Sequence, residues 1–447
     1  MSVLVRIALR NILQARRRSA LLSLAVGLVT MLLVLLLAIS QGIEDNLVRA
    51  ATTVSAGHVN VAGFFKPTPG SARPIITNVR ELRKVVEENT PGLAYVVERH
   101  RGWGKIVSDT GSTQAGLSGL TVANEQRFLD TIRLAEEREY KEGGRAEVLG
   151  DVRKLSESHT IMLFAGQAKR LGVNVGDVIT IQTETFGGQT NTLDATVVAI
   201  AKDIGLLSSW SAFVPAGDIL ELYALNEDTS GALWVYLDDI KRSDEVMNHL
   251  RDVLAAKGYP LMEHQPQPFF FKFDQVTGED WTGQRIDVTT WRDEVSFLTY
   301  VLTAFNSLSW FLVGILVVII AVGIMNTMWN AVRERTREIG TMRAIGMSRG
   351  RVLVMVVLES ALLGLFATSV GALLGTLLSA MVNRAEWVVP VDAVKVILLS
   401  DTLRMSVTPR DALASVAVLS AFTVLASLWP AIRAASLRPI TALQHVE

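Results

Sequence analysis

The longest uncharged run of the chain extends from Val295 to Val332 and is expected to lie in a membrane. As a straight helix it would be about 57 Å long, against about 30 Å of hydrocarbon in a bilayer. We therefore expect one spanning helix whose first turns stand outside the membrane as a stalk. Two separate spans are the alternative, but no proline or charged residue divides the run. Two crossings would also place the following arginines outside, against the positive-inside rule.

Three further apolar runs are long enough to cross a bilayer, namely 19–43, 352–383 and 411–433. The first follows Arg16, Arg17 and Arg18, so its basic side is expected to stay in the cytoplasm. A cleaved signal peptide shares this pattern, but the run exceeds the apolar core of about 7 to 15 residues that is typical of signal peptides. Four spans with cytoplasmic termini agree with an apolar fraction of 49%.

Residues 44–294 have mixed charges and most of the prolines, and they predict a large soluble α+β domain outside the membrane. Leu82, Val85 and Val86 share one face of an expected helix at 78–89. The Gly187–Gly188 pair predicts a hairpin turn between two β-rich runs. We expect these runs to belong to an inserted β-rich subdomain at about 110–230.

The predicted fold is an α-helical membrane protein with four transmembrane helices and a large α+β extracytoplasmic (periplasmic) domain inserted between helices 1 and 2. Its expected segments are a cytoplasmic amphipathic helix at 1–18, helix 1 at 19–43, the domain at 44–294, stalk and helix 2 at 295–332, a cytoplasmic elbow at 333–351, helix 3 at 352–383, a periplasmic loop at 384–410, helix 4 at 411–433 and a cytoplasmic tail at 434–447.

Polar and small residues within the apolar runs have two expected roles. Glu359 is the ionisable residue of the third run and is a functional candidate by position. The structural alternative is pairing with an elbow arginine, Asn326 or Asn330. Gly371 and Gly375 are one helical turn apart, a spacing that lets two helices approach closely.

Several kinds of chemistry have no sequence support. The chain lacks G-x-x-x-x-G-K-[ST], so it is not expected to bind ATP, and no catalytic residue or cofactor is assigned to it. The six histidines show no metal-binding spacing, and Ser156, Ser158 and His159 stand in no nucleophile motif. The chain has no cysteine, and a net charge of −1 argues against nucleic acid as a partner.

The elbow R-E-R-T-R-E-I-G-T-M-R-A-I-G-M-S-R-G-R at 333–351 resembles the signature of the MacB and FtsX superfamily of ABC transporter permeases (type VII). PAIRAASLRPITAL (430–443) resembles its C-terminal signature, AKRLGVNVGDVITI (168–181) its extracytoplasmic domain, and ALRNILQARRRSALL its usual opening. The resemblance covers essentially the whole chain. In layout the chain looks closest to the LolC and LolE lipoprotein-releasing permeases, because it lacks the fused ATPase of MacB.

The resemblance implies a permease subunit, not an enzyme, in a bacterial inner (cell) membrane. Such a subunit works with a dimer of ABC ATPases that bind ATP and Mg, and with a second permease that is identical or homologous. Motion driven by ATP hydrolysis would be relayed to the periplasmic domain. That domain would extract or export a lipoprotein or other amphipathic substrate. Further partners would be membrane lipid and a periplasmic chaperone or adaptor. The alternatives are MacB-like efflux through an adaptor and outer-membrane duct, and FtsX-like regulation of a periplasmic cell-wall enzyme without transport.

The elbow is expected to act as the coupling helix that enters a groove on the ATPase. An ordinary positive-inside loop is the alternative, but such a loop does not need glutamates in register with apolar side chains. The expected coupling residues are charged at the start of the elbow, with apolar side chains for an ATPase pocket and glycines for close approach or a bend: Arg333, Glu334, Arg335, Arg337, Glu338, Gly340, Met342, Arg343, Ile345, Gly346 and Met347.

Overall fold

The computed structural model describes residues 2–14, 16–387, 389 and 402–436. These residues form two compact units, a helical unit from residues 1–44, 302–388 and 402–447 as far as they are described, and a domain at 45–301 that we call the inserted domain. Residues 388 and 390–401 of the expected loop at 384–410, and residues 437–447 of the expected tail at 434–447, lie outside the described residues.

The helical unit contains α1 (Ser2–Gln14), α2 (Arg16–Ala50), α12 (Ser296–Glu334), α13 (Thr336–Ala344), α14 (Arg349–Ala385) and α16 (Pro409–Ser436). Four of the described helices, α2 from Ser19 onward, α12, α14 and α16, are long and apolar enough to cross a membrane. The predicted fold class is therefore confirmed. The run from Val295 to Val332 lies almost wholly in one continuous helix of 39 residues, so the structure has no break for two spans.

Small residues bring α14 against α2 and α16. A Cβ atom at Gly371 would lie 2.2 Å from the carbonyl oxygen of Gly27, and one at Gly364 would lie 2.9 Å from Thr423. Gly375 likewise faces Met31 of α2, at 3.1 Å. Because glycine has no Cβ, the backbones can approach to distances that a larger residue would prevent.

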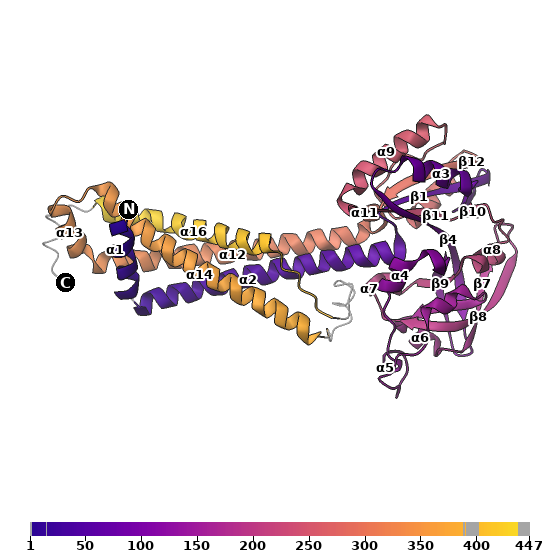
Figure 1. Ribbon diagram of the computed structural model, residues 1–447, viewed down its shortest axis with the longest axis horizontal. Coiled ribbons are helices and arrows are strands. Elements are labelled where there is room, and N and C mark those ends of the chain that lie inside the picture. Colours follow the sequence, from indigo (N-terminus) through magenta and orange to yellow (C-terminus); the bar gives the residue numbers. More distant parts are fainter. Residues whose placement is uncertain (1, 15, 388, 390–401, 437–447) are drawn as a thin grey trace. The chain divides into compact units, whose positions relative to one another are not determined.

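The inserted domain begins with an open antiparallel sheet in the order β12 (Gly283–Thr290), β1 (Val59–Thr68), β11 (Ala232–Leu237) and β4 (Leu93–Val107). Alternate residues of β1, β11 and β4 enter two different cores, as the two-residue repeat of a strand requires. In β11, Leu233 and Val235 meet α3 (Val79–Asn89) and α9 (Ser243–Ala256), which lie together on one side of the sheet (Figure 1). Trp234 and Tyr236 face the opposite side, towards Phe269.

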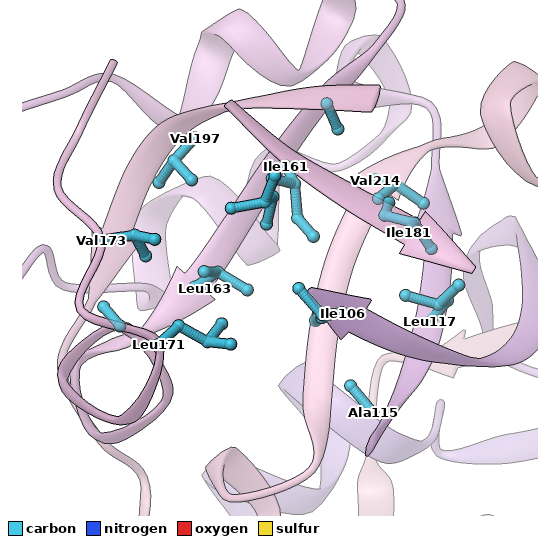
Figure 2. Packing of buried hydrophobic residues seen from close by; sticks show 14 of the residues in the cluster. Ile106, Ala115, Leu117, Ile161, Leu163, Leu171, Val173, Ile181, Val197 and Val214 are labelled. Atoms are coloured by element: carbon cyan, nitrogen blue, oxygen red, sulfur yellow. The ribbon is translucent and has the colours of Figure 1, made fainter. Parts of the chain in front are cut away.

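The second half of β4 belongs to a closed barrel. Six strands pair in the order β4, β5 (Ser112–Leu120), β9 (Ser211–Pro215), β6 (Thr160–Phe164), β8 (Thr190–Ala201) and β7 (Val178–Glu184), and β7 pairs back onto β4. The closure places Ile106 opposite Ile181. Figure 2 shows the apolar side chains of these strands, among them Ile161 and Leu163, gathered between them. Five of the six barrel strands fall within the β-rich subdomain expected at about 110–230, whereas β4 lies before it.

Short elements complete the inserted domain. Hairpin strands and small helices connect the two sheets, and an aromatic segment covers the free side of the open sheet. They are η1 (Ala51–Ser55), β2 (Ser71–Arg73), β3 (Ile76–Thr77), η2 (Val122–Asn124), α4 (Gln126–Thr131), α5 (Glu137–Tyr140), η3 (Val152–Ser156), α6 (Ala165–Leu171), α7 (Gly205–Ser208), α8 (Ala216–Tyr223), β10 (Thr229–Ser230), η4 (Ile240–Arg242), η5 (Phe269–Lys272), α10 (Phe273–Gly278) and α11 (Trp291–Glu294).

Candidate functional site

The expected elbow forms a short helix, α13, between the ends of α12 and α14. Its C-terminus is closed by two backbone hydrogen bonds, from Gly346 N–H to Arg343 O (3.1 Å) and from Met347 N–H to Met342 O (3.0 Å). This pattern requires a left-handed residue just beyond the helix. Gly346 has φ 104°, a conformation that glycine adopts without a side-chain clash. The glycine therefore sets the sharp turn into α14.

The two faces of α13 differ in burial. Ile339 and Gly340 are buried, and Met342 is half-buried against the core of the helical unit. The opposite face is exposed and carries residues at helical spacing, namely Arg337, Glu338, Thr341, Ala344 and Ile345. We call these five residues the outer face of α13. Ile345 is 82% exposed, which is unusual for a large apolar side chain beside a packed core.

Arg335 connects the elbow to two other helices. Its Nη1 lies 3.3 Å from Oε2 of Glu359 in α14, and its Nη2 donates to the carbonyl oxygen of Asn11 in α1 (3.0 Å). Both side chains of the ion pair are largely buried. A hollow of about 300 Å³ beside the pair is lined by α1, α12, α13 and α14. Since burial makes an unpaired charge costly, the pair holds the start of α13 against the helical unit.

A second contact holds the end of α13. Arg343 Nη1 donates to the carbonyl oxygen of Ala435 in α16 (3.1 Å). Nearby, the Trp329 ring stacks on Trp429 with centroids 6.0 Å apart, and the guanidinium groups of Arg333 and Arg433 lie 5.5 and 5.3 Å from the Trp329 centroid. Aromatic rings with cationic neighbours are typical of a membrane–water interface.

The residues predicted from the sequence thus fall into separate groups. Arg335 and Arg343 connect α13 with other helices, whereas Arg333, Glu334, Arg337 and Glu338 are exposed. Of the partners considered for Glu359, the structure provides the arginine, while Asn326 and Asn330 are exposed on α12. Among the apolar residues expected to fill an ATPase pocket, Met342 and Met347 pack on the chain's own core. Of the three apolar residues predicted to contact the ATPase, Ile345 is therefore the one whose side chain is exposed.

The inserted domain also contains a groove that was not among the sites predicted from the sequence. Its cavity volume is about 980 Å³, against about 300 Å³ for the elbow hollow, and it lies between the barrel and the aromatic segment η5–α10. Trp103, Trp210, Phe270 and Phe271 line it and are all partly exposed. The sequence FFFKF at 269–273 was a signal for one wall. The other wall combines Trp103 of β4 with Trp210 beside β9, which are far apart in the sequence.

Two family descriptions match the chain. The MacB-like periplasmic core domain matches residues 19–253, which is more than half of the chain. The FtsX-like permease C-terminal domain matches residues 310–439. The first description covers most of the inserted domain, and the second covers α13 and the helices on both sides of it.

Curated relatives match parts of the chain. The ABC transporter permease YtrF of Bacillus subtilis is 33% identical over 154 residues, which are 34% of this chain and 35% of that protein. The macrolide export ATP-binding/permease protein MacB of Chlorobaculum tepidum is 33% identical over 128 residues, 28% of this chain and 17% of that protein. An uncharacterized ABC transporter permease of Methanocaldococcus jannaschii is 26% identical over 254 residues, 55% of this chain and 54% of that protein. The matches thus span at most 54% of the length of these relatives.

Solved structures of domains also match. The extracellular domain of the noncanonic ABC-type transporter YknZ from Gram-positive bacteria is 12% identical, with a TM-score of 0.29 over 51% of this chain and 98% of that chain. The periplasmic region of MacB from Actinobacillus actinomycetemcomitans is 13% identical, with a TM-score of 0.29 over 54% of this chain and 91% of that chain.

Proposed function

This chain belongs to the MacB/FtsX-type permeases of ABC transporters, and we propose that it is the membrane subunit that couples ATP hydrolysis by a separate ATPase to motion of its inserted domain. ATP and Mg²⁺ would be bound by that ATPase, and a second permease, identical or homologous, would complete the assembly. The inserted domain would lie on the outer side of a bacterial cell membrane and both termini in the cytoplasm, as the arginines around the first span favour.

The division of α13 into a packed face and an outer face carries this proposal. A loop that only sets topology needs positive charge, but it does not need a helix docked by Arg335 and Arg343 with an apolar side chain projecting from it. Exposed Ile345 amid charged neighbours has the composition of an interface centre with a polar rim. A push on this face would reach α1, α14 and α16 through the contacts described above.

The cargo that we propose is a lipoprotein or another amphipathic molecule. The aromatic groove of the inserted domain supports an amphipathic cargo, because it offers apolar surface outside the spanning helices. MacB-like efflux is the second candidate, and the MacB relatives, whose name refers to macrolide export, support it.

The coupling proposal can be tested by photo-crosslinking in cells. A photoreactive amino acid at Ile345 or Thr341 of the full-length chain should capture a protein with the nucleotide-binding motifs of an ABC ATPase. The matched control is the same residue at Ile339, which belongs to α13 but is buried. Capture from all three positions alike, or no ATPase among the products from 341 and 345, would contradict the proposed docking face.

A charge exchange then tests coupling itself. Arg337→Glu combined with Glu338→Arg keeps the net charge but reverses the pattern on the outer face. In the purified complex we expect the permease-stimulated ATPase rate to fall to the basal rate of the ATPase, with membrane insertion unchanged. An unaltered stimulated rate would exclude these two residues from coupling.

A further inference from the structure

The groove of the inserted domain has two aromatic walls. Trp103 and Trp210 come from the barrel, and Phe270 and Phe271 come from the aromatic segment on the open sheet. These rings are between 41% and 62% exposed, and they line a cavity of about 980 Å³. Apolar surface that is exposed inside a concavity favours an apolar ligand.

A buried cation lies in the same groove. Arg101, Trp103 and Lys105 are at alternate positions of β4, all three line the groove, and alternate residues of a strand share a face. Arg101 is only 6% exposed, and its guanidinium carbon lies 4.6 Å from the centroid of the Phe269 ring. Its Nη1 atom is buried and finds no hydrogen-bond partner in the protein.

The other buried cations of the inserted domain are satisfied. Arg99 Nε lies 2.7 Å from Oε1 of Glu125, Lys272 Nζ lies 2.7 Å from Oδ2 of Asp287, and Lys66 Nζ donates to the carbonyl oxygen of Val276 (2.7 Å). A buried guanidinium without such oxygens is costly, because arginine stays charged in proteins. Arg101 differs from these cations because the nearby carboxylates of Glu294 and Asp287 act on it through their charge, while its buried Nη1 atom has no hydrogen-bond partner.

Glu294 is the buried carboxylate that also lines the groove, but its oxygens are already engaged. Oε2 accepts a hydrogen bond from the backbone N–H of Phe269 (3.2 Å), and Oε1 accepts one from the hydroxyl of Thr289 (2.9 Å). Burial raises the pKa of Glu294 and lowers the pKa of Arg101. Both shifts indicate that these charges lack the solvation that a free pair in water would have.

We propose that the groove binds an anionic amphiphile, with its acidic head group at Arg101 and its apolar body between the aromatic rings of the two walls. The inference rests on the proposed function in one respect, namely that such a molecule would be the cargo. A guanidinium offers paired donors to a carboxylate or phosphate, and the rings offer surface that tolerates varied apolar bodies. The lining of the groove also includes the exposed side chains of Lys105, Glu184 and Asp274, so the buried cation at Arg101, and not the net charge of the rim, would select the acidic head group.

The experiment measures equilibrium binding of radiolabelled dodecanoate to the full-length chain in lipid nanodiscs, without ATP and with empty nanodiscs as background. We expect saturable binding to the unmodified chain. In Arg101→Gln the affinity for dodecanoate should fall at least about tenfold, because a charge-assisted hydrogen bond is lost. The matched control is Arg285→Gln. The guanidinium carbon of Arg285 also lies over an aromatic ring, 4.6 Å from the centroid of Trp281, but Arg285 does not line the groove. The affinity of Arg285→Gln for dodecanoate should therefore stay within about twofold of that of the unmodified chain.

Two further arms separate the head group from the apolar body. Dodecan-1-ol should bind the unmodified chain about tenfold more weakly than dodecanoate and should bind Arg101→Gln equally weakly. Phe271→Ser, at a ring that is 62% exposed, should weaken both ligands. These arms decide the question even if Arg101→Gln fails to fold.

Three results would overturn the assignment: unchanged dodecanoate binding in a folded Arg101→Gln chain, equal binding of the alcohol, or displacement of dodecanoate by millimolar inorganic phosphate, which would indicate a site for small anions. Because binding is measured without nucleotide or ATPase, its failure leaves the crosslinking test at α13 unaffected. Failure of that crosslinking would likewise leave the groove assignment intact.

Discussion

Arg335 illustrates what single residues contribute to the elbow. The sequence showed an arginine-rich segment and one ionisable residue in the following span, so pairing of Glu359 with an elbow arginine was foreseeable. It did not show which arginine, because that depends on where α12 ends and α13 begins. In the structure the partner of Glu359 is Arg335, which lies between α12 and α13 and also donates a hydrogen bond to the carbonyl oxygen of Asn11 in α1.

We predict that Glu359→Gln lowers the thermal unfolding midpoint of the full chain in nanodiscs. Removing one partner of a buried pair leaves a charge without compensation, which costs about 1–3 kcal/mol. Glu338→Gln is the matched control, because Glu338 is exposed on α13, and it should leave the midpoint nearly unchanged. Equal midpoints for the two variants would contradict a stabilising role of the ion pair.

His58 makes the inserted domain sensitive to acid. Burial and the charge of Arg127 lower its pKa to about 4, and its Nδ1 accepts a hydrogen bond from the backbone N–H of Leu237 (3.0 Å). Between about pH 6.5 and pH 4 the unfolded imidazole binds a proton that the folded one does not. Stability therefore falls with falling pH in this window, by at most about 1.4 kcal/mol per pH unit.

We predict that His58→Gln is less sensitive to acid than the unmodified chain. The difference between their thermal unfolding midpoints should change between pH 6.5 and pH 4.5 and stay constant above pH 7. The comparison isolates His58 from carboxyl groups such as Glu294, whose raised pKa acts in the opposite direction. Parallel midpoint curves across this range would show that His58 is not the responsible group.

Arg101 shows the limit of sequence analysis at this scale. An arginine in a strand that alternates with polar and small residues is typical of a solvent-exposed face. Its burial results from the aromatic segment of residues 269–273, which is far away in sequence. No local pattern around residue 101 contains that information.

At the scale of elements, the spacing of Gly371 and Gly375 predicted a close helix contact but not its partner. The partner is α2, where Gly27 lies opposite Gly371. Boundaries were less predictable: the elbow helix covers Thr336–Ala344 and not all of 333–351, because α12 continues to Glu334 and Gly346 closes α13 early.

We predict that Gly371→Leu separates α14 from α2 and lowers the unfolding midpoint by several degrees, since even a Cβ atom would lie 2.2 Å from the Gly27 oxygen. Gly314→Leu in α12 is the matched control, because a Cβ atom there has no neighbour within 4 Å. A similar loss in both variants would indicate an effect of helix composition and not of the contact.

At the scale of the whole molecule, the number of spans and the inserted α+β domain were predictable, because long uncharged runs have few alternatives in a folded chain. The closed barrel was not predicted. Its closure depends on β4, a strand of 15 residues that belongs to two sheets. Strand pairing over such distances has no local signature.

The proposed orientation gives a labelling prediction, which is simple to test because the chain has no cysteine. A membrane-impermeant maleimide should label Glu142→Cys, exposed in the inserted domain, in intact spheroplasts. It should label Ile345→Cys only after the membrane is permeabilised. Labelling of Ile345→Cys in intact spheroplasts would place α13 on the outer side and contradict the proposed topology.

The two sheets of the inserted domain differ in when they can be completed during biosynthesis. All barrel strands lie between Leu93 and Pro215, so the barrel can close as soon as this contiguous segment has been exported. The open sheet needs β12, which ends at Thr290 directly before α11 and α12. Until then one edge of β1 lacks its partner, and unpaired edges promote aggregation. Completion of this sheet is therefore tied in time to the arrival of the second apolar run at the membrane.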